Sequence, residues 1–186
     1  MLSAPLREFL RAAERLAARE PDVSCLLAWL TPEFRRLLAT PDLLAPECLA
    51  APTGGYVQHA LYGSPSGRLA LVALVWRPGA CTPIHDHVAW GLAGVYRGCE
   101  RETRYSWCEH AGAARLRVVD TREVGPGEVV PIVPPSDIHQ VANPLPEPTV
   151  SLHLYGSNVL ATASGTSVRC VYPPGLVLPA VPAGAR

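Results

Sequence analysis

The sequence predicts a mainly β fold, a sandwich or barrel that is preceded by α-helices. From about Tyr56 onward, short runs rich in β-branched and aromatic residues follow one another closely, separated by turn signals such as GPG, PPS and NPLPEP. Before residue 45, apolar residues instead recur at helical spacing. Because the strand-like runs follow one another directly, the pattern favours a sandwich or barrel over an alternating βαβ fold.

A chain of 186 residues fits a single domain with a sizeable core. We expect residues 1–186 to form one unit, in which a helical segment at 1–45 packs on a barrel at 56–174. The tail at 175–186 is rich in proline and alanine, and we expect it to be a loose surface strap or disordered.

Helical periodicity covers residues 3–40. In its first part, apolar residues alternate with Arg and Glu at helical spacing, as at Leu6, Phe9 and Leu10. A second stretch runs from about Ser24 to Leu38. Within it Pro32 follows Thr31, an order typical of the first turn of a helix that a hydroxyl caps.

The strand-like runs each carry the valine, isoleucine and aromatic residues that suit a pleated surface. Two further short strands are expected around two histidine motifs that are described below. The seven runs are residues 68–76, 90–98, 100–108, 114–124, 128–134, 149–156 and 166–173.

Composition excludes several classes of partner. Sixteen basic and sixteen acidic residues balance, so neither nucleic acid nor an anionic membrane is expected as a partner. No run reaches the roughly 18 apolar residues of a membrane span, and the first residues do not resemble a signal peptide. The six cysteines form no CxxC pair, which favours free, mostly buried thiols (Cys81 and Cys99 among them) in a reducing cytoplasm. The oligomeric state stays open.

The densest chemistry lies at Pro83-Ile84-His85-Asp86-His87. Residues two apart in a strand share a face, so His85 and His87 can present both imidazoles to one point, with Asp86 on the opposite face. His139 supplies a third imidazole from a later strand. Three neutral nitrogen donors on a β scaffold would form a facial metal site with open positions.

The frame around these histidines resembles the cupin superfamily, whose motifs run G-x5-H-x-H-x3,4-E-x6-G and G-x5-P-x-G-x2-H-x3-N. The matching residues here are Gly79, His85, His87, Gly98, Gly127, Pro134, His139 and Asn143. This resemblance implies a double-stranded β-helix, the jelly-roll barrel. Gly91 stands where the usual glutamate ligand is expected, and Ser136 replaces a glycine. A site with three histidines and no carboxylate is the form found in thiol dioxygenases.

The segments PIHDHVAWGLAGVYRGCERETRY, DIHQVANP and SLHLYGSNV together resemble the cysteine dioxygenase family, nearest to its bacterial 3-mercaptopropionate and mercapto-acid branch. The resemblance implies an Fe(II) cofactor held by His85, His87 and His139. It also implies that a small mercapto carboxylic acid and O2 give a sulfinic acid.

The same resemblance assigns roles to other residues. Ser151, His153 and Tyr155 alternate along one strand and match the family's row of hydrogen-bonded residues beside the iron. The arginine of the mammalian-type enzymes is absent, since Tyr56-Val57-Gln58 stands at its place. In the bacterial enzymes the carboxylate anchor follows the row, which implies Arg169 here.

Three alternatives stay open at the level of sequence. The chain is a cysteine dioxygenase proper, or a non-catalytic metal-binding cupin that binds a small ligand, or a cupin enzyme with another reaction. The missing glutamate ligand at Gly91 counts against the last of these. Charge-balanced helices without a helix-turn-helix pattern count against a role in DNA binding.

Overall fold

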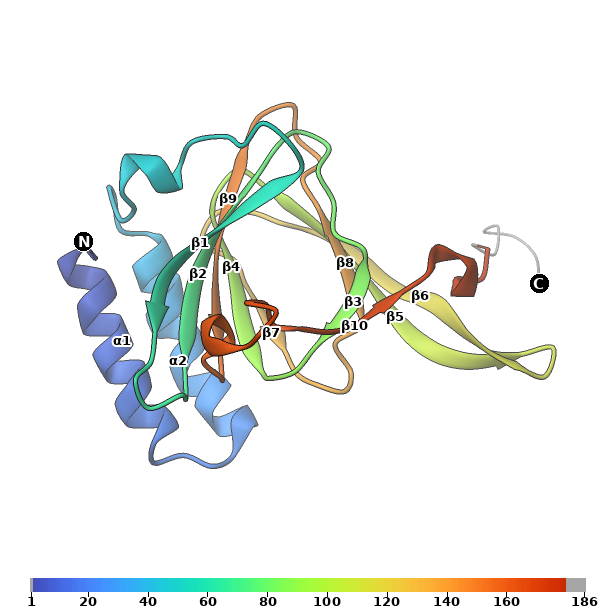
Figure 1. The fold of residues 1–186 in the computed structure, drawn as a ribbon, viewed down its shortest axis with the longest axis horizontal. Coiled ribbons are helices and arrows are strands. Elements are labelled where there is room, and N and C mark those ends of the chain that lie inside the picture. The colour runs from blue at the N-terminus through green and yellow to red at the C-terminus, as the bar shows by residue number, and fades with distance from the viewer. Residues whose placement is uncertain (1, 180–186) are drawn as a thin grey trace.

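The computed structural model describes residues 2–179. Two five-stranded antiparallel sheets face each other across a barrel interior, and two helices lie outside the first sheet (Figure 1). The expected mainly β fold with N-terminal helices is confirmed. The first sheet has the order β1-β2-β9-β4-β7 and the second β10-β3-β8-β5-β6. Their strands are β1 Tyr56–Gly63, β2 Ala70–Trp76, β3 Ile84–His87, β4 Gly91–Arg97, β5 Glu100–His110, β6 Ala113–Val124, β7 Val129–Ile132, β8 His139–Ala142, β9 Thr149–Tyr155 and β10 Val168–Tyr172.

Two helices cover the outer face of the first sheet. Helix α1 (Ala4–Ala17) and helix α2 (Val23–Leu38) bury their apolar stripes in one core cluster with that sheet. Leu152 and Leu154 of β9 belong to this cluster, so the alternate residues of β9 point into the barrel instead. Both faces of β2 and β9 are therefore buried, as their continuous burial shows.

The interpretation of Pro32 as a first-turn residue is wrong, because α2 runs without a break from Val23 to Leu38. The N-cap is Asp22, whose carboxylate accepts from the backbone N–H of Cys25 at 2.8 Å. The Thr31 hydroxyl donates back to the carbonyl of Leu27 at 2.7 Å and so caps nothing.

Each of the seven runs expected to be strands overlaps one strand of the structure, and β5 and β6 extend beyond their expected bounds. Strand β1 was not among them, because its pattern of half-exposed residues at a sheet edge lacks a clear apolar face. Strands β3 and β8 carry the histidine motifs and pair at His85 and His139. Strands β5 and β6 extend beyond the barrel as a long hairpin (Figure 1).

All six cysteines are free, but the expectation that most are buried is wrong, since only Cys48 is. Cys81 is exposed because it lies between two inward-pointing neighbours, Ala80 and Thr82. Of the C-terminal tail, Val177 bridges to Leu116 of β6, so this part is held against the second sheet. Residues 180–186 of the expected strap lie outside the described residues. Neither helix of the described chain combines the length and the apolar character that crossing a membrane requires.

Candidate metal centre

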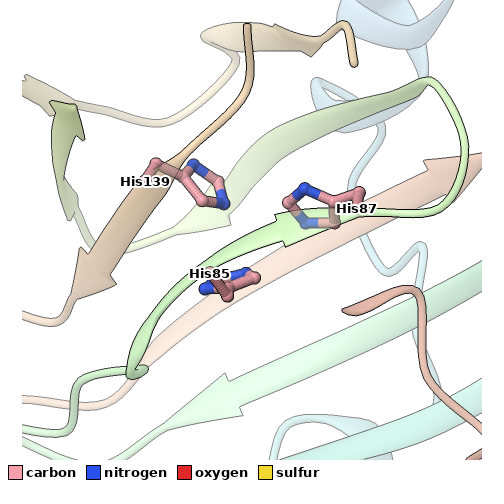
Figure 2. A group of neighbouring side chains, drawn as sticks. All are labelled: His85, His87 and His139. Atoms are coloured by element: carbon pink, nitrogen blue, oxygen red, sulfur yellow. The ribbon is translucent and has the colours of Figure 1, made fainter. Parts of the chain in front are cut away.

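Three histidines meet inside the barrel. His85 and His87 come from β3, and His139 faces them from β8 (Figure 2). One ring nitrogen of each lies within 4.8 Å of the others, and all three side chains are buried. Because β3 and β8 pair directly at His85 and His139, the sheet itself brings the two motifs together. The geometry suits one shared metal ion.

The outward ring nitrogen of each histidine is already engaged. His85 Nδ1 lies 2.9 Å from the carbonyl oxygen of Pro83, which can only accept a hydrogen bond. His87 Nδ1 lies 3.0 Å from Asp137 Oδ2, and His139 Nδ1 lies 2.9 Å from Glu102 Oε1. Each Nδ1 therefore carries the proton, and each Nε2 keeps a free lone pair for a metal.

Burial favours the neutral form of His85 and His139. It lowers the pKa of His85 to about 3, and the nearby rings of His139 and His87 add to the effect. Burial also lowers the pKa of His139, against the opposing hydrogen bond to Glu102. A neutral ring is the form that binds a metal. Three clustered imidazoles with oriented Nε2 atoms fit a transition-metal ion such as ferrous iron.

The two supporting carboxylates are charged. Burial alone would raise the pKa of Glu102, but the hydrogen bond with His139 and the charge of Arg104 outweigh it and hold that pKa at about 2. Burial would also raise the pKa of Asp137, but the hydrogen bonds with His87 outweigh burial and lower that pKa. Ionised carboxylates behind two ligands make those imidazoles better electron donors to a metal.

Ser151, His153 and Tyr155 form a buried row on β9, beside the three histidines. Ser151 Oγ lies 3.1 Å from His153 Nε2, and Tyr155 Oη lies 3.2 Å from His153 Nδ1. The Tyr155 ring stacks on His87 with 6.0 Å between ring centroids. Both nitrogens of His153 are thus occupied within the row. Tyr155 is the member of the row whose side chain borders the cavity together with His153.

Burial also sets the charge of this row. It lowers the pKa of His153 to about 3, and repulsion from the nearby rings of His87, His139 and His85 adds to the effect. It raises the pKa of Tyr155 to about 12, although the nearby Ser167 hydroxyl acts in the opposite direction. At neutral pH the row therefore consists of a neutral imidazole and a protonated phenol.

A small cavity opens at the three histidines. Leu74, Trp76 and Val141 form apolar walls, and Tyr155 and His153 border it. Tyr56, Gln58, Thr82 and residues 166–168 complete its lining. No arginine or ionised carboxylate belongs to that lining within residues 2–179. Its polar groups are amides, hydroxyls and imidazoles.

The structure does not bring Arg169 to this cavity. Its Nε donates to Asp86 Oδ2 at 3.1 Å, and its side chain is 47% exposed. Val168 lines the cavity, so the next residue along β10 points to the opposite face. Asp86 lies on that face too, fully buried, and accepts from Tyr172 at 2.8 Å as well. Arg169 thus pairs with Asp86 and does not line this cavity in the structure.

Four functional candidates escaped the sequence interpretation: Glu100, Glu102, Asp137 and Gln58. The two glutamates alternate along β5, which puts them on one face, but this pattern equally fits a solvent-facing hairpin. Asp137 precedes His139 by two residues, and that spacing was the available signal. Gln58 was noted only as the residue at an absent arginine's place.

Gly91, at the place of the usual cupin glutamate, has no room for a side chain. A Cβ there would lie 2.8 Å from the carbonyl oxygen of Leu154 and 3.1 Å from Cδ1 of Tyr155. A fourth, acidic ligand is therefore excluded sterically at this position. The donor set of the described site is three imidazoles.

Comparison with known proteins gives one family and several distant structures. The family model for cysteine dioxygenase type I matches residues 55–162. A Klebsiella pneumoniae protein with a double-stranded β-helix domain shares 13% identity, with a TM-score of 0.48, over 63% of this chain and 86% of that one. A cupin superfamily protein from Desulfitobacterium hafniense shares 14% identity, with a TM-score of 0.45, over 63% of this chain and 94% of that one.

Proposed function

Because the chain belongs to the cysteine dioxygenase type I family, we propose that it is a non-haem Fe(II) thiol dioxygenase. Its substrate would be a small mercapto carboxylic acid resembling 3-mercaptopropionate. The reaction places both atoms of O2 on the sulfur, so that RSH and O2 give RSO2H. The observation that carries this proposal is the set of three imidazoles without an acidic ligand, next to a buried tyrosine.

His85, His87 and His139 would hold the iron through their Nε2 atoms, since each Nδ1 is bonded to an oxygen. Bound Fe(II) would supply binding positions for the thiolate and for dioxygen. Neutral imidazoles leave its two positive charges uncompensated. A substrate with a thiolate and a carboxylate supplies two negative charges, which favours a mercapto acid in this cavity.

The Tyr155 hydroxyl is the end of the row that borders the cavity. Because burial raises the pKa of Tyr155 to about 12, it stays protonated and can donate a hydrogen bond to substrate oxygen or sulfur. His153 and Ser151 hold that hydroxyl in place through their hydrogen bonds. We assign Tyr155 the catalytic contact, and His153 and Ser151 the positioning of it.

The lining of the cavity favours a mercapto acid over cysteine. No carboxylate lines it within the described residues, so the ammonium group of cysteine would lack an ionic partner. A substrate carboxylate would instead accept from neutral groups, namely the Gln58 amide and the Thr166 and Ser167 hydroxyls. The six free thiols support a reducing compartment such as the cytoplasm.

An oxygen-electrode comparison tests the proposal. Iron-loaded protein should consume oxygen with 3-mercaptopropionate faster than with cysteine or cysteamine. His139→Ala should abolish this uptake, whereas His110→Ala, at an exposed position on β5, should leave it unchanged. If iron-replete protein consumes no oxygen with any thiol of the panel, the proposed function is wrong.

A further inference from the structure

Glu100 places a buried carboxyl group behind the row of Ser151, His153 and Tyr155. It stands at the start of β5, and its side chain is 5% exposed, inside the barrel. The Ser151 hydroxyl and the Trp76 indole N–H both lie close enough to act on its pKa. Its Oε1 atom has no hydrogen-bond partner among the described residues. A buried carboxyl oxygen without a partner is costly, so this arrangement calls for a reason.

The Ser151 hydroxyl can accept two hydrogen bonds and donate one. Its oxygen accepts from Trp76 Nε1 at 3.1 Å, and one further acceptance and one donation remain. If Ser151 donates to His153 Nε2, the imidazole carries its proton on Nδ1 and donates to the oxygen of Tyr155. The O–H of Tyr155 then points away from the row, into the cavity.

The same atoms are also satisfied when every donor and acceptor in the row exchanges its role. If Ser151 donates to Glu100, it must accept from His153 Nε2–H instead. His153 Nδ1 is then unprotonated and accepts the O–H of Tyr155. In that arrangement the Tyr155 hydroxyl turns back into the row and is lost to the cavity.

We propose that Glu100 is a positioning residue that sets the direction of this hydrogen-bonded row. As a carboxylic acid it donates to Ser151, and the row runs outward to a free Tyr155 O–H. As a carboxylate it accepts from Ser151, and the row runs inward. The switch costs one proton, which Glu100 loses to solvent, while His153 exchanges one tautomer for the other.

The surroundings of Glu100 keep its acid form accessible. Burial raises its pKa to about 7, and Glu102 on the same strand adds to the rise, while Ser151 and Trp76 oppose it. On β9, the charge of Glu100 raises the pKa of Tyr155. From β6, the residue opposite is the apolar Val124. Neither an arginine nor a histidine acts on Glu100 among these contacts.

The tautomer of His153 is the direct readout, and it does not depend on activity. The experiment uses the full chain, metal-free and labelled with 15N-histidine, with His153→Gln to assign the signal. Between about pH 5.5 and about pH 8.5 the proton should move from Nδ1 to Nε2. In Glu100→Gln, which stays neutral and offers an N–H donor, it should remain on Nδ1 throughout. Glu100→Leu leaves His153 as the acceptor for the Ser151 hydroxyl, so the proton should likewise stay on His153 Nδ1. A single tautomer across this range in the unaltered protein would overturn the proposal.

A kinetic arm rests on the proposed function. The rate of oxygen uptake at saturating thiol should fall by about tenfold as Glu100 ionises, and Glu100→Gln should abolish this decline. Glu109→Gln, an exposed position on the same strand, should keep it. Both proteins share one substrate, so thiol ionisation affects them equally. Absence of any uptake would refute the function, whereas identical pH profiles for Glu100→Gln and the unaltered protein would refute the role of Glu100.

Discussion

Gly91 packs directly against Tyr155, so that a Cβ at position 91 would lie 3.1 Å from the tyrosine ring and 2.8 Å from the backbone oxygen of Leu154. This contact links two features of the site. It leaves no room for an acidic side chain at position 91, and it brings the backbone there close to the Tyr155 ring. A larger residue at position 91 would therefore disturb the ring whose hydroxyl borders the cavity.

Gly91→Ala should therefore damage both stability and activity. The added methyl meets backbone that cannot move easily, so we expect about 1–3 kcal/mol of destabilisation and a lowered rate of oxygen uptake. Thermal unfolding and the oxygen electrode measure the two effects. Gly54→Ala is the matched control, because a Cβ there meets nothing within 4 Å. Equal behaviour of the two variants would refute the steric role of Gly91.

Glu102→Gln should weaken metal binding. The charged acceptor behind His139 Nδ1 is lost, and supporting contacts of this kind contribute about 10–100-fold in metal affinity. Competition with a chelator measures the Kd for Fe(II). Glu123→Gln removes a carboxylate that is 59% exposed and paired with Arg101, and it should leave the affinity unchanged. An unaltered Kd in Glu102→Gln would contradict the assigned role.

The metal-free protein should lose stability in mild acid through His153. Burial lowers its folded pKa to about 3, from an ordinary value of 6.5, so the unfolded chain binds the proton first as the pH falls. Stability is then complete above about pH 6.5 and declines toward about pH 3, by about 1.4 kcal/mol per pH unit for this group. Urea unfolding at several pH values measures the slope. His153→Gln should reduce it by this amount, and an unchanged slope would refute the buried neutral imidazole.

Arg169→Ala should affect stability and spare substrate binding. Its loss leaves the fully buried Asp86 without its cationic partner, so we expect a lower melting temperature. The KM for a mercapto acid should stay the same, because Arg169 does not line the cavity. The Arg101 side chain is 50% exposed and paired with an exposed Glu123, so Arg101→Ala should destabilise the protein less. A selective rise in KM for acids would restore Arg169 as the carboxylate anchor.

Strand periodicity explains what the sequence could predict of the site. His85 and His87 share a face because they are two apart, and the same holds for Ser151, His153 and Tyr155. The order of the motifs indicated that His139 belongs with them, and β3 and β8 do pair at that residue. The apolar runs likewise marked the strands that form both sheets.

Cross-strand register explains what the sequence could not predict. Glu102 reaches His139 because β5 pairs with β8, and nothing in the local sequence of β5 encodes that partner. Arg169 meets Asp86 because β10 pairs with β3, and the local sequence of β10 does not encode that partner. Gln58 lines the cavity from an edge strand whose weak pattern hid it.

The most direct test of the whole account is the fate of labelled dioxygen. Iron-loaded protein should be supplied with 3-mercaptopropionate under 18O2, and the product mass should be measured. The account predicts a sulfinic acid in which both oxygen atoms carry the label. A product that carries one labelled atom or none, or a disulfide alone, would contradict it.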